Sequence, residues 1–519
     1  MPFSNVPGRI AKASGIVMAG VFLSRLLGFV RDLAVAHQFG SSSTTDAYYS
    51  AFTLPDFLNY LVAAGALSVT FIPVFSRYMT EKQEEEGWYA FSTVVTVMGL
   101  VLVALVAISE VFASQLVDFI APGLTSAEKA RTIFLTRLML PAQIFFYLGS
   151  ILSAVQYAKA QFTIPSLAGV VYNLGVILGG LTLSSRIGIT GFAVGVLGGS
   201  MVGNFLLQIY GAQRAGARFT PNLNIRHPGF RWFIRLSIPI MLALSLPATD
   251  DWIIRRFGSY LVPGSITWLN YAKNLMRVPL GVVGMSVGVA SFPFLAQLYS
   301  DGKLDELKRT LNATLKGLIL LLFPISALTI AESAPLVRFV FLHTRLHGAA
   351  LDATAAALRV FSISMFAWAM QNILARVFYA ARDTITPAVV GTSITFLMLP
   401  VYWWMARHFQ YLGLAFASSF GITTYTVLLL LLLKRRIPNS QAGPLLIFAA
   451  KVGAVSTLAG LACFKLCGWL GSILGWQTTL QALLVLVITT SVGLALLALF
   501  ARLIGVKEFD DYLKRVVAR

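Results

Sequence analysis

The chain has 519 residues, of which 57% are hydrophobic and only 12% are charged. Soluble globular domains are typically about 45–50% apolar and 25% charged, so this composition excludes a soluble globular protein and predicts an integral membrane protein. The formal net charge is +19. The Lys and Arg residues are spread between apolar segments, which indicates loops that follow the positive-inside rule rather than a nucleic-acid-binding surface.

Apolar stretches long enough to cross a bilayer recur along the whole chain. We expect an all-α integral membrane protein with about fourteen transmembrane helices, each needing about 20 apolar residues. The segment before the first stretch, 1–12, is short and polar, so we expect the first helix to remain as an anchor rather than be cleaved. The expected spans lie at 13–38, 45–76, 88–117, 132–158, 164–185, 188–212, 232–256, 265–298, 310–331, 352–380, 385–406, 410–433, 443–468 and 476–504.

The first expected helix carries charges inside its apolar run. A helical repeat places Ser24, Arg25, Gly28, Arg31 and Asp32 on one face, opposite a face of apolar residues. A charge near the bilayer centre costs about 2.5–3.5 kcal/mol even on the mildest scale, so such residues usually face a water-filled cavity. We therefore predict that Arg25, Arg31 and Asp32 line a substrate cavity. The alternative is that the arginines snorkel from a helix end and Asp32 neutralises one of them.

The next expected helix has a polar face of its own. Asp46, Tyr49, Thr53, Asp56 and Tyr60 recur at spacings of three and four residues. Asn59 lies beside this face, and Pro55 loosens the helix. We predict that Asp46 and Asn59 join the same cavity.

These stretches resemble the MurJ (MviN) family of lipid II flippases, in the MOP transporter superfamily. The similarity rests on SRLLGFVRD at 24–32, TDAYYSAFTLPDFL at 45–58, AGALSVTFIPVFS at 64–76 and NYAKNLMRVPLGVVG at 270–284. It implies transport of a lipid-linked pyrophosphate, the peptidoglycan precursor lipid II, across the bacterial cytoplasmic membrane. It also implies contact with membrane lipids and with cell-wall synthesis proteins. The resemblance also implies arginine at the positions of Asn59 and Asn274, where members of the family usually carry it, so this chain departs from the pattern at both.

A repeat relates the two halves of the chain. Pro73 and Pro293 share similar surroundings at an offset of 293 − 73 = 220, and Pro165 and Pro387 do so at 387 − 165 = 222. Gly191 and Gly413 also differ by 222. Recurrence at nearly constant spacing predicts two parallel six-helix lobes related by a pseudo-two-fold axis along the membrane normal. We expect an N-lobe at 1–222, a C-lobe at 223–438, and two additional helices with a tail at 439–519.

The second lobe carries its own polar groups within apolar stretches. Lys273, Asn274 and Arg277 share one helical face, and we predict that they bind the substrate together with the first lobe. Asp250, Asp251 and Asn372 are candidate ligands for a coupling cation. A cation or the membrane potential is the expected driving force, with no other cofactor. Cys463 and Cys467 lack nearby His or acidic residues, so no metal site is expected.

The last two spans lie outside the repeat. The family resemblance implies that they form a groove for the lipid tail, and ordinary packing helices explain them equally well.

Basic residues set the expected orientation. They are concentrated at the termini and in every second loop, as at Arg9, Lys82, Arg218 and Lys308. Both termini are therefore predicted to be cytoplasmic.

Arginines in a cavity suit an anionic headgroup, because guanidinium keeps its charge when desolvated and binds phosphate through paired hydrogen bonds. Four other functions stay open at this point. A flippase for another lipid-linked oligosaccharide has the same requirements, whereas a cation or drug antiporter of the same superfamily favours acidic residues. A membrane glycosyltransferase needs carboxylates in the first extracytoplasmic loop, 40–45, which has none. A scaffold for cell-wall assembly needs no buried charge. No catalytic motif is present, so we expect a transporter and not an enzyme.

Overall fold

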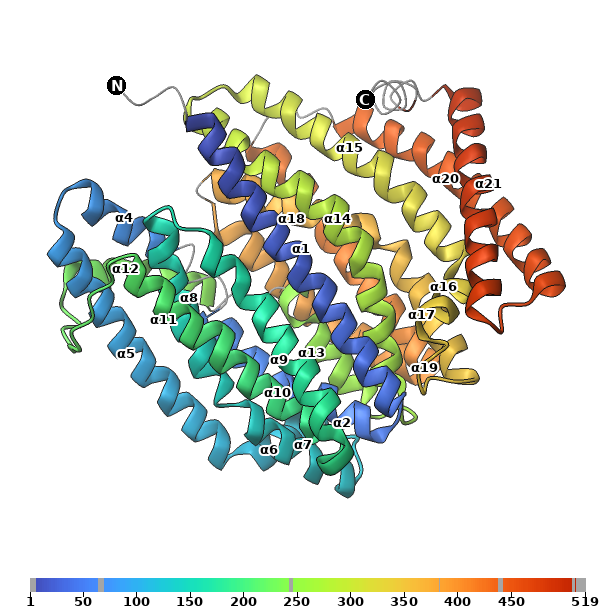
Figure 1. Ribbon diagram of the computed structural model, residues 1–519. Coiled ribbons are helices and arrows are strands. Elements are labelled where there is room, and N and C mark those ends of the chain that lie inside the picture. Colours follow the sequence, from blue (N-terminus) through green and yellow to red (C-terminus); the bar gives the residue numbers. More distant parts are fainter. Residues whose placement is uncertain are drawn as a thin grey trace. The chain divides into compact units, whose positions relative to one another are not determined.

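The computed structural model describes residues 6–63, 70–241, 246–381, 383–436, 442–505 and 509. Within these ranges all regular secondary structure is helical, which confirms the predicted fold class. Contacts divide the chain into two units, Met1–Leu244 and Ser245–Arg519. Figure 1 labels the helices in chain order.

The described residues contain eight helices that are long and apolar enough to cross a membrane, or nine if one bent pair counts as a single span. The protein is therefore a multi-pass membrane protein. One of the eight, Ile385–Lys434, covers two predicted spans, because Gln410 has φ 53° and ψ −137° and breaks the helix between them. The predicted total of fourteen stays a prediction.

The described part of unit 1 consists of α-helices and short π-helical segments. They are α1 (Val6–Phe39), α2 (Ser43–Ala51), α3 (Thr53–Leu58), η1 (Asn59–Ala63), α4 (Ile72–Thr80), α5 (Glu84–Val111), α6 (Ala113–Ile120), α7 (Ser126–Met139), α8 (Ala142–Ala158), α9 (Thr163–Ile187), α10 (Thr190–Ser200), η3 (Met201–Leu206), α11 (Leu207–Arg214) and α12 (Pro228–Met241).

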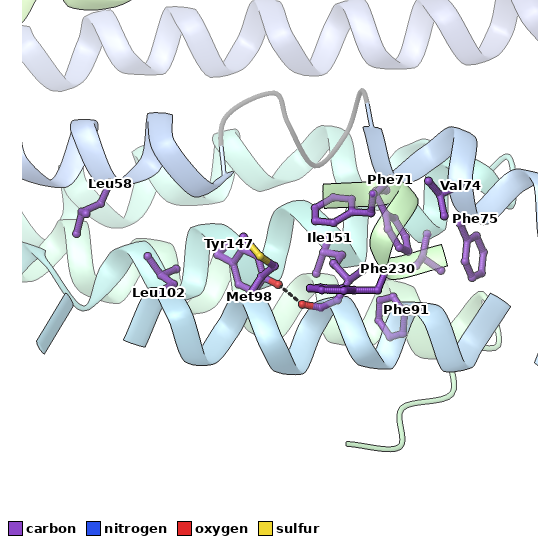
Figure 2. Packing of buried hydrophobic residues seen from close by; sticks show 14 of the residues in the cluster. Leu58, Phe71, Val74, Phe75, Phe91, Met98, Leu102, Tyr147, Ile151 and Phe230 are labelled. Carbon is purple, nitrogen blue, oxygen red and sulfur yellow. Dashed lines mark hydrogen bonds between the residues drawn. The ribbon is translucent and has the colours of Figure 1, made fainter. Parts of the chain in front are cut away.

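An aromatic core holds α4, α5, α8 and α12 together. Phe71, Phe75 and Phe91 are at most 2% exposed and pack around Phe233 and Tyr147. The hydroxyl of buried Tyr147 donates to the carbonyl oxygen of Val94 at 2.8 Å, and Figure 2 shows this side chain within the cluster. The bond satisfies a polar group that would otherwise be costly to bury. This core joins the four helices to one another.

Several predicted spans are not single continuous helices, as at 88–117, which is broken at Phe112, and 352–380, which is broken at Ser364. The span expected at 45–76 is divided into α2, α3, η1 and α4, and residues 64–69 lie outside the described part. The span expected at 232–256 contains α12 and α13 (Leu246–Gly258), and residues 242–245 between them lie outside the described part. In the span at 45–76, Pro55 lacks the N–H that a helix interior requires, which accounts for the break before α3.

Unit 2 repeats the helical organisation and adds two helices. Its elements are α13, α14 (Ser265–Ser300), α15 (Leu304–Ala331), α16 (Ser333–Phe341), α17 (Ala349–Ile363), α18 (Met365–Ala380), α19 (Ile385–Arg436), α20 (Ala442–Leu474) and α21 (Thr479–Ile504). Helices α20 and α21 pack against each other, and α20 also packs along α15. Figure 1 shows them as the red pair at the end of the chain.

The backbone breaks of the two units recur at the offsets found in the sequence. Lys82 and Gly302 both have positive φ at the turn before a long helix, 220 residues apart (302 − 82). Gly188 and Gln410 both have positive φ, 222 residues apart (410 − 188). Phe112 and Glu332 end one helix and begin the next, again 220 apart (332 − 112). The internal repeat is therefore present in the backbone of each unit.

The contact boundary after Leu244 groups α12 with unit 1, whereas the repeat places the expected lobe boundary at 222. Hydrogen bonds made by residues 215–227, the linker before α12, explain why α12 is grouped with unit 1. Asn222 accepts from Thr93 at 2.6 Å, and the Thr220 amide donates to Ser92 at 3.0 Å. These bonds hold the linker, residues 215–227, against α5. The two lobes and their symmetry axis stay predictions.

Candidate functional site

Close helix packing positions the polar face of α1. Ser24 and Gly28, two members of the predicted stripe, lie against α9. The amide nitrogen of Asn173 on α9 donates to the Ser24 carbonyl oxygen at 3.1 Å and to the Gly169 carbonyl oxygen at 2.8 Å. Small residues let membrane helices approach closely, and an amide bond across them fixes the register. Part of the stripe is therefore a helix contact rather than a cavity surface.

Arg31 and Asp32 form an ion pair in this fixed frame. Both Nε and Nη2 of Arg31 donate to Oδ1 of Asp32, at 3.1 and 3.0 Å. The Asp32 side chain is 4% exposed and that of Arg31 is 22% exposed. Tyr48, Tyr49 and Tyr172 lie close enough to interact electrostatically with the guanidinium. The result is a half-buried arginine oriented by one carboxylate and surrounded by phenol groups.

The other predicted residues of unit 1 have different exposures. Arg25 is exposed, Asp46 is 4% exposed in the first turn of α2, and Asn59 is half-buried as the first residue of η1. A π-helical segment often marks a functional position in a helix. The structure thus brings Arg31 and Asp32 together and leaves Arg25 on an exposed side of the same helix.

In unit 2 the predicted residues form one chain of polar contacts. The ammonium of Lys273 donates to Asp250 and to Asp251. The hydroxyl of Tyr402 and that of Ser418 also donate to Asp250, the latter at 2.8 Å. Asp250 is 1% exposed and Lys273 is 2% exposed. Lys273 was expected to present charge to a substrate, but here its charge is buried between two carboxylates.

Arg277 lies at the accessible end of this chain. Its Nη2 donates to Oδ2 of Asp251 at 2.9 Å, and its Nη1 donates to the Asn274 side-chain oxygen at 3.3 Å. The side chains of Arg277 and Asp251 are each 36% exposed. Along α14, Lys273 is therefore buried in an ion pair, whereas Arg277, one turn later, has a partly exposed guanidinium.

The candidate cation ligands are placed differently from the expectation. The ammonium of Lys273 already lies between Asp250 and Asp251. Asn372 is exposed on α18 and donates to the Trp368 carbonyl oxygen at 2.9 Å, one turn earlier. Among the described residues no group of three or more His, Cys, Asp or Glu side chains could hold a metal ion.

Several residues of these clusters were missed by sequence reasoning. Tyr172, Tyr402 and Ser418 are ordinary members of apolar helices, and nothing in their local spacing distinguishes them. Glu332, a buried acid outside both clusters, had a visible signal, because it is a single acid between two apolar segments. Trp368 contacts Lys273 through its ring, with 5.2 Å between the ammonium and the ring centroid.

Comparison with known proteins identifies the family. The family model described as lipid II flippase MurJ matches residues 35–476, which is most of the chain. The chain belongs to the MurJ family. The resemblance expected from its motifs is confirmed.

MurJ relatives cover nearly the full length of the chain. The lipid II flippase MurJ of Burkholderia cenocepacia is 28% identical over 449 residues, covering 85% of this chain and 87% of the relative. The probable lipid II flippase MurJ of Thermotoga maritima is 26% identical over 496 residues, covering 96% and 97%.

Solved structures show the same fold. A lipid II flippase MurJ in an inward closed conformation has a TM-score of 0.77 and 22% identity, covering 94% of this chain and 98% of its own. An inward-facing multidrug resistance MATE family transporter of the MOP superfamily has a TM-score of 0.62 and 14% identity, covering 80% and 94%. The MurJ fold is therefore shared with a wider transporter superfamily.

Proposed function

We propose that this protein is a lipid II flippase, a transporter rather than an enzyme. It moves the undecaprenyl-pyrophosphate-linked peptidoglycan precursor from the cytoplasmic to the outer leaflet by alternating access. Membership of the MurJ family supports this assignment. The observation that carries the chemistry is that each unit has a partly exposed arginine oriented by one aspartate, Arg31 by Asp32 in unit 1 and Arg277 by Asp251 in unit 2.

The arginines suit a pyrophosphate for a physical reason. A guanidinium has five N–H donors in a rigid fork, stays charged when desolvated and matches the geometry of phosphate oxygens. Arg31 directs two donors at Asp32, and Arg277 directs one at Asp251. Each aspartate thereby holds its arginine in one orientation before substrate arrives, which lowers the ordering cost of binding.

The substrate role of the second lobe then falls on Arg277 and Asn274 rather than on Lys273. Lys273 is 2% exposed and neutralises two carboxylates, so its ammonium is engaged within the protein. Arg277 is one helical turn further along and is partly exposed. We propose that it takes over the role of the arginine that the family resemblance implies at the position of Asn274.

The deciding experiment is replacement of a known lipid II flippase in depleted cells by the gene for this protein. We expect growth, and we expect Arg277→Ala to abolish it while the protein still inserts. Arg186→Ala is a matched control, because Arg186 is an exposed arginine at the end of α9. Growth of the Arg277→Ala strain at wild-type protein levels would exclude the headgroup role of Arg277.

A flippase for another lipid-linked oligosaccharide is the second candidate. It is favoured by asparagine at positions 59 and 274, because amides suit sugar hydroxyls better than charge does. Purified wild-type protein that moves such a lipid but never lipid II would establish this alternative.

We propose that the membrane potential, and not a cation bound by Asp250, Asp251 and Asn372, drives turnover. The position of the Lys273 ammonium between the two carboxylates supports this. Transport in proteoliposomes at a fixed potential should then be the same in sodium, potassium and choline media. A strict requirement for one of these cations would refute the proposal.

We also propose that both termini are cytoplasmic and that the protein works beside cell-wall synthesis proteins. The first part follows from the distribution of basic residues. The second part follows from the chemistry of the product, which must be consumed by enzymes that polymerise the released precursor at the outer leaflet.

A further inference from the structure

Glu332 is a buried acid that the proposed transport mechanism does not use. It lies between α15 and α16 and is 7% exposed. Both of its carboxyl oxygens lie 2.9 Å from the hydroxyl of Thr490 on α21. One hydroxyl carries only one proton, so it can donate to only one of the two oxygens at a time.

The carboxyl lies deep along a membrane-spanning helix. Thr490 is eleven residues beyond Thr479, the first residue of α21 (490 − 479 = 11). At 1.5 Å per residue this is about 16 Å along the axis. Helix α21 has 26 residues, so Thr490 and the carboxyl that it contacts lie near its middle. An ionised carboxylate at such a depth is unfavourable unless a cation accompanies it.

No cation forms an ion pair with Glu332 in the described part of the chain. Among the residues that the structure describes, the titratable groups that face this region are the Cys463 and Cys467 thiols of α20 and Arg359 of α17. Arg359 donates to Ser333 at 2.6 Å and stacks on the Phe464 ring at 5.5 Å. Asp250, by contrast, is a buried acid that does form an ion pair, with Lys273.

The helix break itself does not require an acid. The matching break in unit 1, 220 residues earlier, has Phe112 with φ −92° and ψ 13°, against φ −98° and ψ 9° at Glu332. Phe112 is 50% exposed. A carboxyl is therefore present only at the break that packs against α21, an element outside the repeat.

We propose that Glu332 is a proton-binding site within the membrane. The carboxylate takes up one proton, its charge changes from −1 to 0, and the neutral acid is the form stable between α15, α20 and α21. The protonated oxygen becomes a donor and the other oxygen accepts from Thr490. This site is separate from the arginines assigned to the substrate and does not depend on the substrate's identity.

The test is infrared difference spectroscopy of the full-length protein in lipid nanodiscs, which detects the carbonyl stretch of a protonated carboxylic acid. We expect this band at neutral pH, sensitive to deuterium exchange and absent in Glu332→Gln. Asp352→Asn is the matched control, because Asp352 is 65% exposed and paired with Arg338 at 2.7 Å. A wild-type spectrum with no band lost in Glu332→Gln would overturn the proposal.

A second variant keeps the test decisive if Glu332→Gln fails to fold. Thr490→Val retains the acid and removes its hydroxyl donor, so the same carbonyl band should shift in frequency. An unchanged spectrum would overturn the assignment. Thermal stability supplies an independent readout, because a folded form that binds an extra proton loses stability as pH rises. The wild type should show this loss and Glu332→Gln should lack it.

Discussion

Arg31 and Arg277 occupy similar local settings in different units. Each is partly exposed on a long helix, and each donates to one aspartate at about 3 Å, at 3.0 Å for Arg31 and 2.9 Å for Arg277. The aspartate lowers the net charge of each site but orients the remaining donors. At the level of single residues, the chemistry therefore depends on guanidinium geometry as well as on charge.

Substitution of Arg31 tests this geometry. We expect Arg31→Ala to lower lipid II flipping in proteoliposomes about 10–100-fold, because hydrogen bonds to charged groups contribute about 1.5–3 kcal/mol. Arg31→Lys should be impaired as well, because an ammonium lacks the planar fork. Normal flipping by Arg31→Ala at equal protein levels would contradict the assigned role.

We expect Lys273 to contribute to the stability of the folded protein rather than to contact the substrate during transport. Lys273→Met leaves Asp250 buried without its cation, which costs about 3–5 kcal/mol. We expect a marked fall in thermal unfolding temperature in detergent, partly restored by the double variant with Asp250→Asn. Lys308→Met removes an exposed pair with Asp305 and should change stability by less than about 1 kcal/mol. Equal effects of the two single variants would refute the buried-pair interpretation.

At the level of elements, α1 is held to α9 by small residues. A Cβ added at Gly20 would lie 2.6 Å from the Ser166 carbonyl oxygen and 2.7 Å from its Cβ. Neither atom can move without moving α9. The polar face of α1 is thus positioned by contacts that contain no charge.

We expect Gly20→Val to separate α1 from α9 and to reduce both folded yield and thermal stability. Gly15→Val is the matched control on the same helix, since nothing lies within 4 Å of a Cβ at that position. Fluorescence-detected size exclusion with heating measures the difference. Equal melting temperatures for the two variants would show that this contact does not limit stability.

At the level of the whole molecule, orientation decides which leaflet loads the substrate. Cys463 and Cys467 are buried and can be replaced to give a cysteine-free background. We expect a cysteine at position 42 to react with a membrane-impermeant reagent added from outside. A cysteine at position 510, which lies outside the described residues, should not react. The reverse pattern would invert the proposed topology.

The sequence alone determined the properties that depend on composition and period. Hydropathy indicated a multi-pass helical membrane protein, the motifs indicated the MurJ family, and the repeat offsets of 220 and 222 recur as backbone breaks. These are local features or features of chain spacing, so no knowledge of packing is needed to find them. The count of spans was harder to obtain, because predicted spans such as 45–76 and 88–117 consist of shorter helices.

Only the tertiary structure decided which charges are available. Lys273 and Arg277 are one turn apart on α14 and look equivalent in sequence, yet one is 2% exposed and the other has a side chain that is 36% exposed. The difference comes from residues distant in the chain, since Asp250, Tyr402 and Ser418 meet only when α13 packs against α19. In the same way, Glu332 meets Thr490 across 158 residues of sequence. Burial and pairing are properties of packing, and no local spacing encodes them.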